Sequence, residues 1–259
     1  MQAQKSMMQA HQNRLARFGH GARAFGRGLR FVVSHRALWP LVAAPALLTL
    51  LATLAGAGAA WAWGHALIAH HLAGHGAFLA TLLLIVFVLF VAGVAYLAFL
   101  AVSVVATAPF SGAISERVER LATGGAPGPD GFFAQLAEAA RELVHTVFEL
   151  AIYLALAAIL LALHLFLPPL APFTWPASLA LTAIFLAYDA FDLPLSRRRA
   201  SFARKWRCLW DHGAESLGFG VVVALLLAIP GLNLVVPAVA AASGTLLYLE
   251  LGEPPDSVL

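Results

Sequence analysis

Three long stretches of the chain contain no charged residue, and these stretches decide its class. They cover residues 37–115, 151–188 and 216–249. A helix needs about 20 consecutive apolar residues to cross the hydrocarbon core of a bilayer, and each stretch exceeds that length. Because no soluble core requires such runs, the pattern predicts an all-α integral membrane protein whose first partner is the lipid bilayer.

The first stretch predicts two long membrane-spanning helices, Leu38–Trp63 and Phe78–Thr107. The second of these has about 30 residues and a length of about 45 Å, so it must tilt or project beyond the hydrocarbon. The segment between them, Gly64–Ala77, has four histidines and no lysine or arginine. By the positive-inside rule this loop is external and the basic N-terminus is cytoplasmic.

Proline interrupts both remaining stretches near the middle, and each predicts a helical hairpin. In Ser216–Leu249 the break is Pro230-Gly231, with Pro237 after it. It leaves halves of about 14–16 residues, or about 21–24 Å, against a hydrocarbon thickness of about 30 Å. We therefore expect both halves to enter and leave on one side. The segment 144–190 breaks at Pro168-Pro169, and its arms of about 20 residues fit either full crossings or partial penetration.

The N-terminal segment is basic and predicts an amphipathic helix in the membrane interface. Residues 1–36 contain seven lysines and arginines and no acidic residue, and apolar residues recur every three or four positions from Leu15 to Val32. Such a helix sets its arginines against lipid phosphates. Four glycines here weaken the helix by up to about 1 kcal/mol each. The alternative is a basic arm that binds nucleic acid. Because an apolar spanning segment directly follows, the anionic bilayer surface is the closer partner for these arginines, and we expect no nucleic-acid partner.

The composition excludes several other classes of protein. Of the 259 residues, 61% are hydrophobic and 11% are charged, with a mean hydropathy of +0.83. A soluble domain of this size has about 25% charged residues. The sequence has no serine-hydrolase, zinc-protease or phosphate-loop motif, so we expect neither an enzyme nor a cofactor. The single cysteine, Cys208, and the histidines at 71 and 75 lack the partners that a metal site needs.

Charged residues cluster after the second spanning helix. We expect a short helix that begins at Ser111, after a break at Pro109, and ends at Gly124-Gly125. It carries Glu116, Arg117, Glu119 and Arg120. Glu116 and Arg120 are spaced to pair on one face, either on an ordinary solvated helix or in a ring of charges around a pore in an oligomer. A further basic cluster, Arg197–Arg199 with Arg204, Lys205 and Arg207, falls on the same side of the membrane as the N-terminus.

Asn233 follows the break at Pro230-Gly231 and is placed to cap the next half-helix. A capped helix start inside the membrane presents a positive dipole end, which favours an anion. Broken helices of this kind build substrate sites in transporters. The alternative is a structural turn in which the cap only satisfies buried N–H groups.

Several short motifs occur in a fixed order along most of the chain. They are Gly28-Leu29-Arg30, Leu38-Trp39-x5-Pro45, Ala108-Pro109-Phe110-Ser111-Gly112, Glu116-x-x-Glu119, Tyr188-Asp189-Ala190-Phe191-Asp192, and Ile229-Pro230-Gly231-Leu232-Asn233-Leu234-x-x-Pro237 with Thr245. Their order and spacing resemble the CysZ sulfate-permease family, whose eukaryotic relatives are the etoposide-induced endoplasmic-reticulum membrane proteins. The resemblance runs from about Phe25 to Glu250.

This resemblance implies a helical membrane domain at 37–250 with two long spanning helices and partly penetrating hairpins, between the N-terminal segment at 1–36 and a short tail at 251–259. It further implies homo-oligomers in the bacterial inner membrane that take up sulfate. Where the family carries a basic pair near the start of the first span, this chain has Trp39 and Pro40.

The candidate residues of an anion path follow from the charges and the resemblance together. The cationic and polar candidates are Arg36, Arg117, Arg120 and Asn233, and the acidic candidates are Glu116 and Glu119. The alternative function is a non-transporting membrane scaffold that organises lipids or partner proteins through its basic cytoplasmic face.

Overall fold

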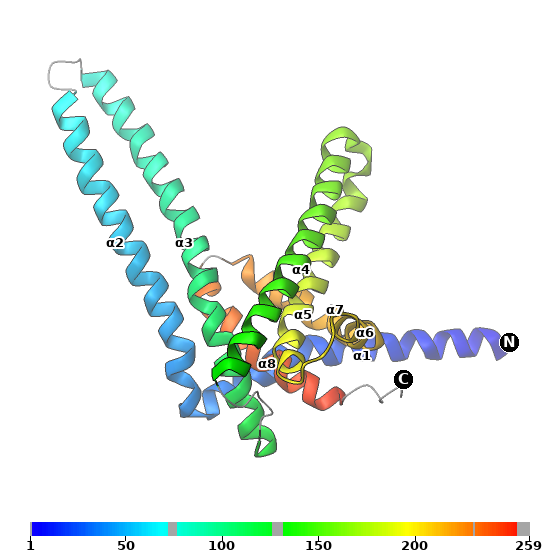
Figure 1. Cartoon of the computed structure of the whole chain (residues 1–259). Helices are drawn as coiled ribbons and strands as arrows, with labels where there is room; N and C mark the ends of the chain where they lie inside the picture. Colours follow the sequence, from blue (N-terminus) through cyan, green and yellow to red (C-terminus); the bar gives the residue numbers. More distant parts are fainter. Residues whose placement is uncertain (1, 72–76, 126–131, 230, 253–259) are drawn as a thin grey trace.

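The computed structural model describes residues 2–71, 77–125, 132–229 and 231–252, and within them every regular element is a helix. Two pairs of long helices rise from a base of shorter helices and the N-terminal helix (Figure 1). This arrangement confirms the all-α membrane class. In chain order the elements are α1 (Gln2–Ser34), η1 (Arg36–Leu38), α2 (Trp39–His71), α3 (Ala77–Thr123), α4 (Phe132–Phe166), η2 (Pro168–Leu170), α5 (Ala171–Arg197), α6 (Phe202–Asp211), α7 (Gly213–Leu227), η3 (Leu232–Leu234) and α8 (Val236–Leu251).

The first long pair is α2 packed against α3. α2 continues to His71, although the sequence predicts a loop from Gly64 onward. Alanine, leucine and isoleucine follow that glycine, and their helix propensity outweighs a cost of about 1 kcal/mol for one glycine. The rest of the predicted loop, 72–76, lies outside the described residues.

The second helix of this pair, α3, differs more from the prediction than α2 does. The separate short helix predicted from Ser111 does not form, because its residues are the last turns of α3, which runs unbroken through Pro109 to Thr123. A proline inside a helix removes one hydrogen bond and strains the preceding turn, but packing on both sides can hold the helix together. Here Ile114 and Val118, just past the proline, are fully buried against α1 and α8.

The second long pair, α4 and α5, is joined by a tight proline turn. α4 ends at Phe166 and α5 begins at Ala171, with η2 between them, at the position where the sequence places the break. A hydrogen bond of 3.2 Å between His164 Nδ1 and Thr174 Oγ1 ties the two arms together beside the turn. The imidazole is therefore a hydrogen-bonded group within an apolar hairpin.

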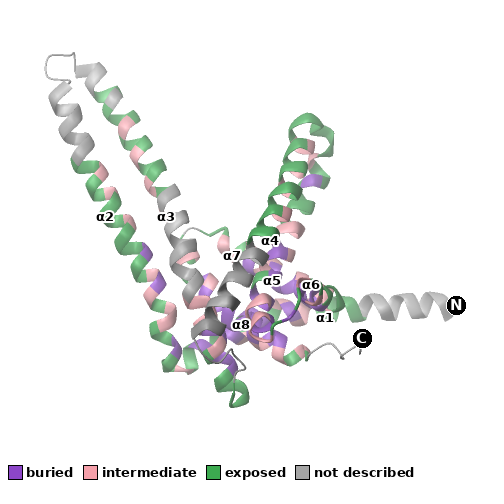
Figure 2. Ribbon diagram, in the orientation of Figure 1, coloured by how far each residue is buried: buried purple, intermediate pink, exposed green. Residues whose placement is uncertain are grey.

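The arms of both pairs expose large apolar side chains instead of burying them. Leu51 is 63% exposed, Phe90 68% and Phe166 83%, and Figure 2 shows exposed residues along the described parts of these arms. Among the residues that the structure describes, three helical stretches are long and apolar enough to cross a membrane, namely Arg36–Ala62, Val147–Phe166 and Pro168–Arg197. An apolar surface of this extent needs lipid or protein around it.

α7 and α8 come from one apolar run that is broken at its centre. α7 has 15 residues and α8 has 16, and the chain turns between them at Gly231, whose φ is +89°. A positive φ of this size favours glycine because it has no Cβ. Pro230 lies outside the described residues. Each half is only about 23 Å long, which is short of a bilayer crossing.

The base is held by close contacts between helix backbones. Gly21 and Gly28 of α1 face α7 and α8, and a Cβ added at Gly28 would lie 2.0 Å from Ser243 Oγ. Gly218 of α7 meets the Phe18 carbonyl in the same way. Small residues let helices approach closely in membranes. Two of the four glycines that weaken α1 as an isolated helix, Gly21 and Gly28, therefore dock it onto the base.

We expect Gly28→Ala to destabilise the protein, because its Cβ would overlap backbone and side-chain atoms of Ser243. Overpacking of this kind costs about 1–3 kcal/mol. The matched control is Gly26→Ala on the same helix, where a Cβ meets nothing within 4 Å and alanine favours the helix by up to about 1 kcal/mol. Thermal unfolding in detergent measures both, and equal melting temperatures would contradict this packing.

Residues 214 and 251, at the outer ends of α7 and α8, are expected on the same side of the membrane. The test places a cysteine at Ala214 or at Leu251 in a Cys208→Ala background and labels intact cells with an impermeant maleimide. Both positions should react, or stay protected, together. Labelling from opposite sides would show that this run crosses the bilayer once, and the hairpin would be wrong.

Candidate functional site

Polar and charged side chains are buried where the ends of α3 and α5 meet α8. Ser115 and Glu119 lie one helical turn apart on α3 and therefore share a face. Both are at most 1% exposed, and so is Thr245 of α8. Buried polar groups are costly unless they find partners. The contacts of these three residues define a junction, which we call the Glu119 junction.

The Glu119 carboxylate is shared by two arginines from the end of α5. Arg197 Nη2 donates to Glu119 Oε2 at 2.6 Å, and Arg198 Nη2 donates to Glu119 Oε1. The side chains of the arginines are 13% and 20% exposed, against 2% for the glutamate. A carboxylate in this position depends on its cations, because breaking a buried pair leaves a charge without compensation.

Hydroxyl groups and an aromatic ring complete the Glu119 junction. Arg197 Nη2 also donates to Ser115 Oγ at 2.9 Å, and that hydroxyl hydrogen-bonds Thr245 Oγ1 at 2.6 Å. Arg198 donates from Nη1 to the Pro194 carbonyl at 3.0 Å, and its guanidinium lies 5.1 Å from the centre of the Tyr248 ring. The arginines are thus held in place by groups other than Glu119.

A second buried ion pair anchors α6 to α5. Lys205 Nζ lies 2.5 Å from Asp192 Oδ1 and donates to Ser196 Oγ at 2.7 Å, and Ser196 donates to Asp192 Oδ2 at 3.1 Å. The lysine side chain is only 1% exposed. Next to it the Trp206 ring lies 4.8 Å from that of Tyr188, between ring centres.

Two further ion pairs fix the basic N-terminal helix to the ends of α7 and α8. Arg17 Nε donates to Glu215 Oε1 at 2.6 Å, and Arg27 Nη2 donates to Glu250 Oε2 at 2.6 Å. The hydrogen bond to Glu215 raises the pKa of Arg17 above its ordinary value, so the guanidinium stays charged. Part of the basic face of α1 therefore serves internal contacts.

The predicted path residues separate into two groups in the structure. Glu119 is buried at the centre of the Glu119 junction, whereas Glu116 pairs with Arg120 at the surface of the same helix. Arg117 is exposed on α3, and Arg36 is exposed in η1, which packs against α1, α2 and α3. The predicted i, i+4 spacing of Glu116 and Arg120 produces the expected pair.

Asn233 occupies a different position from the one predicted. It lies within η3 and does not cap α8, whose N-cap is Val235 and has no side-chain hydrogen bond. Pro237 instead occupies the first turn of α8, where a missing N–H costs nothing. The Asn233 side-chain oxygen is buried and finds no hydrogen-bond donor among the described residues.

Sequence reasoning placed Arg197 and Arg198 only in a basic cytoplasmic cluster and did not select Ser115. The signal available for Ser115 was its spacing of four residues from Glu119 on an otherwise apolar face of α3. No local pattern connects that face with arginines about 80 positions later. Only the docking of α5 and α8 against α3 brings these groups together.

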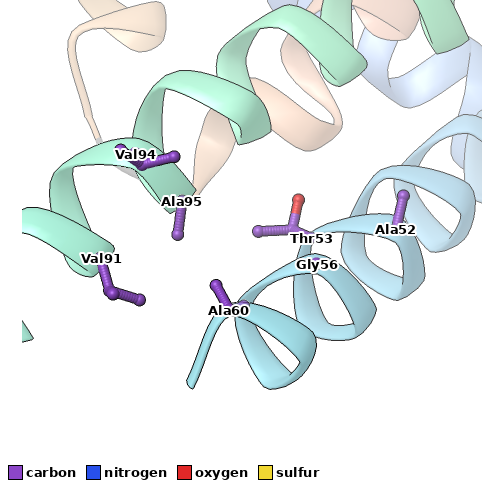
Figure 3. A pocket seen from close by; sticks show the side chains of 8 residues that line it. Ala52, Thr53, Gly56, Ala60, Val91, Val94 and Ala95 are labelled. Carbon is purple, nitrogen blue, oxygen red and sulfur yellow. The ribbon is translucent and has the colours of Figure 1, made fainter. Parts of the chain in front are cut away.

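A separate hollow lies between α2 and α3, well away from these charges (Figure 3). It has a volume of about 220 Å³ and is lined by Ala52, Thr53, Gly56, Ala57, Ala60, Val91, Val94 and Ala95. None of these side chains is charged, so the hollow offers no site for a dehydrated anion.

Comparison with known proteins decides the family. Residues 24–237 match the protein family described as sulfate transporter CysZ/etoposide-induced protein 2.4. The chain belongs to this family. The match includes the ends of α3 and α5 that build the Glu119 junction, and it agrees with the resemblance carried by the sequence motifs.

Individual members of the CysZ family show moderate similarity to the chain. The sulfate transporter CysZ of Pectobacterium atrosepticum is 31% identical over 147 residues, which cover 55% of this chain and 52% of that protein. Those of Vibrio parahaemolyticus and Pseudomonas aeruginosa are 34% and 30% identical and are covered over 58% and 62% of their lengths. The chain thus spans about half the length of the curated relatives it matches.

The CysZ relatives are named as transporters, and this supports a non-enzymatic role for the chain. Among the described residues, no group of three or more histidine, cysteine, aspartate or glutamate side chains could hold a metal ion. At the Glu119 junction the structure brings together arginines, hydroxyls and one carboxylate, and such groups bind ions through hydrogen bonds and charge.

Lys205→Met is expected to destabilise the protein by about 3–5 kcal/mol, because it removes a buried cation from the Asp192 carboxylate. The matched control is Arg207→Met on α6, where an exposed side chain should contribute less than about 0.5 kcal/mol. Thermal unfolding in detergent compares the two variants. Similar melting temperatures would show that the Lys205–Asp192 pair does not hold α6.

Proposed function

We propose that the chain forms a membrane path for a small oxyanion, with sulfate as the first candidate. The observation that carries this proposal is the family match over residues 24–237, together with relatives that are named sulfate transporters. An anion path needs cations or free N–H groups where the dielectric constant is low. The helix ends at the base supply guanidinium groups for that purpose.

We retain Arg36, Arg117 and Arg120 as cations of the anion path, because all three are exposed at the base. Glu116 pairs with Arg120, and Glu119 pairs with the buried arginines of the Glu119 junction. Asn233 stays a candidate of the path through its amide NH2 group, which can donate to an anion, whereas its buried oxygen finds no donor among the described residues and suits a water.

The membrane arrangement in this proposal follows the charge distribution. The N-terminus and the basic loops lie in the cytoplasm, and the arms α2–α3 and α4–α5 reach into a bacterial inner membrane. Several copies assemble, because the broken backbone between α7 and α8 needs protein or water around it at membrane depth. Native mass spectrometry of the uptake sample reports the number of copies.

A membrane scaffold is the second candidate function, and two observations favour it. The hollow in the longest arm is lined by uncharged side chains, and the Glu119 junction is filled by its own carboxylate. A scaffold would use the exposed apolar arms and the basic base to organise lipids or partner proteins, without moving an anion. Uptake measurements separate this function from transport.

Uptake of labelled sulfate into liposomes that carry the purified protein tests the transport function. We expect uptake above that of empty liposomes, and a decrease when Arg36, Arg117 and Arg120 are replaced by alanine. Two charge-assisted contacts are absent at Trp39 and Pro40, so sulfate binding should be about 10²–10⁴-fold weaker than with a basic pair.

The double variant Trp39→Arg/Pro40→Arg should therefore raise uptake. Trp39 Nε1 donates to the Val32 and Val33 carbonyls at 3.2 and 3.3 Å, and an arginine can also donate to carbonyls at a helix end. The control is Trp39→Gln, which keeps a donor and adds no charge. Tight sulfate binding by the unchanged protein that survives all three alanine substitutions would contradict this path.

A further inference from the structure

The Glu119 carboxylate occupies a place that suits an oxyanion from solution. We propose that Arg197 and Arg198 form an oxyanion-binding site whose internal ligand is Glu119, so that a sulfate-like dianion binds there by displacing this side chain. The inference rests on the proposed transport of an oxyanion and assigns a specific site to it.

The donors that hold Glu119 are the donors that bind tetrahedral oxyanions. The two carboxylate oxygens each accept from a different guanidinium, with 2.6 Å between Arg197 Nη2 and Oε2. Arginine binds carboxylate, sulfate and phosphate oxygens with the same planar N–H geometry. A group with more oxygens and more negative charge than a carboxylate can therefore use these contacts.

One further donor remains for such an anion. Arg197 Nε is buried and finds no acceptor among the described residues. The hydroxyls of Ser115 and Thr245 already donate within the protein, because Thr245 Oγ1 donates to the Ala241 carbonyl at 2.8 Å and Ser115 Oγ lies 2.6 Å from Thr245 Oγ1. A buried donor without an acceptor is costly, and an additional anion oxygen would remove that cost.

The arginines are positioned independently of Glu119. Arg198 is held by the Pro194 carbonyl and by the Tyr248 ring, and Arg197 is held by Ser115. A site whose donors are already ordered loses little conformational entropy when its ligand changes. Displacement then requires the rotation of one glutamate side chain near the exposed end of α3, where Arg120 and Leu121 are at the surface.

Charge favours a dianion over a monoanion at this site. Two guanidinium groups contact the Glu119 carboxylate, and a doubly charged ligand attracts both of them more strongly than a single carboxylate does. Chloride lacks the several oxygens that these donors engage. Competition with Glu119 therefore selects for sulfate-like anions, because a weaker ligand leaves the glutamate in place.

Glu119→Gln tests the site, because glutamine keeps the size of the side chain and removes its charge. Equilibrium binding of labelled sulfate is measured on the purified full chain in detergent, with Glu116→Gln as the matched control on the same helix. We expect Glu119→Gln to bind sulfate at least tenfold more tightly than the unchanged protein, and Glu116→Gln to bind it as the unchanged protein does. Addition of Arg197→Gln to Glu119→Gln should abolish the gain.

A milder variant keeps the test decisive if Glu119→Gln fails to fold. Glu119→Asp keeps the charge on a shorter side chain, which weakens its contacts with the arginines. Its affinity for sulfate should lie between those of the unchanged protein and Glu119→Gln. The site would be overturned if the unchanged protein and both variants bound sulfate with equal affinity. It would also be overturned if the tighter sulfate binding of Glu119→Gln persisted after Arg197→Gln was added.

The binding measurement needs no transport, so the two proposals fail separately. Tighter sulfate binding by Glu119→Gln without any uptake into liposomes supports the site and overturns the transport function. If the unchanged protein takes up sulfate and the Glu119 variants bind sulfate no more tightly than it does, the site is overturned and transport through other residues is supported.

Discussion

The shared ion pair at Glu119 is the interaction on which the arrangement of the two long helix pairs depends. It joins the end of α3, from the first pair, to the end of α5, from the second, and Ser115 and Thr245 connect both to α8. Above this point the described parts of the pairs diverge in Figure 1. Because the carboxylate is buried, the relative position of the pairs is set by charge and hydrogen bonds as well as by apolar packing.

A second constraint is that the base and the arms meet different surroundings. Large apolar side chains of the base, such as Tyr188, Phe191 and Phe219, are at most 2% exposed. On the arms, comparable side chains face outward, as Figure 2 shows for their described parts. The chain therefore stabilises its base through its own packing, whereas the arms depend on the bilayer or on other protein chains to cover them.

The sequence predicts the helices well because their cause is local. Uncharged runs longer than a bilayer crossing require helices, and the Pro168-Pro169 pair stands where α4 gives way to α5. The same reasoning failed at Pro109, because the burial of Ile114 and Val118 keeps α3 continuous past the proline. It found Glu119 but neither of its arginines, since contacts between residues about 80 positions apart arise only from helix docking.

The glycine contacts of the base have a mechanical consequence. With Gly28 against Ser243, Gly218 against Phe18 and Gly220 against Ala183, the backbones of α1, α5, α7 and α8 interlock with no room to slide. These helices form one closely packed unit, and the short turn η1 connects α2 to it. The first pair meets this unit through η1 and through the end of α3, where Glu119 pairs with Arg197 and Arg198.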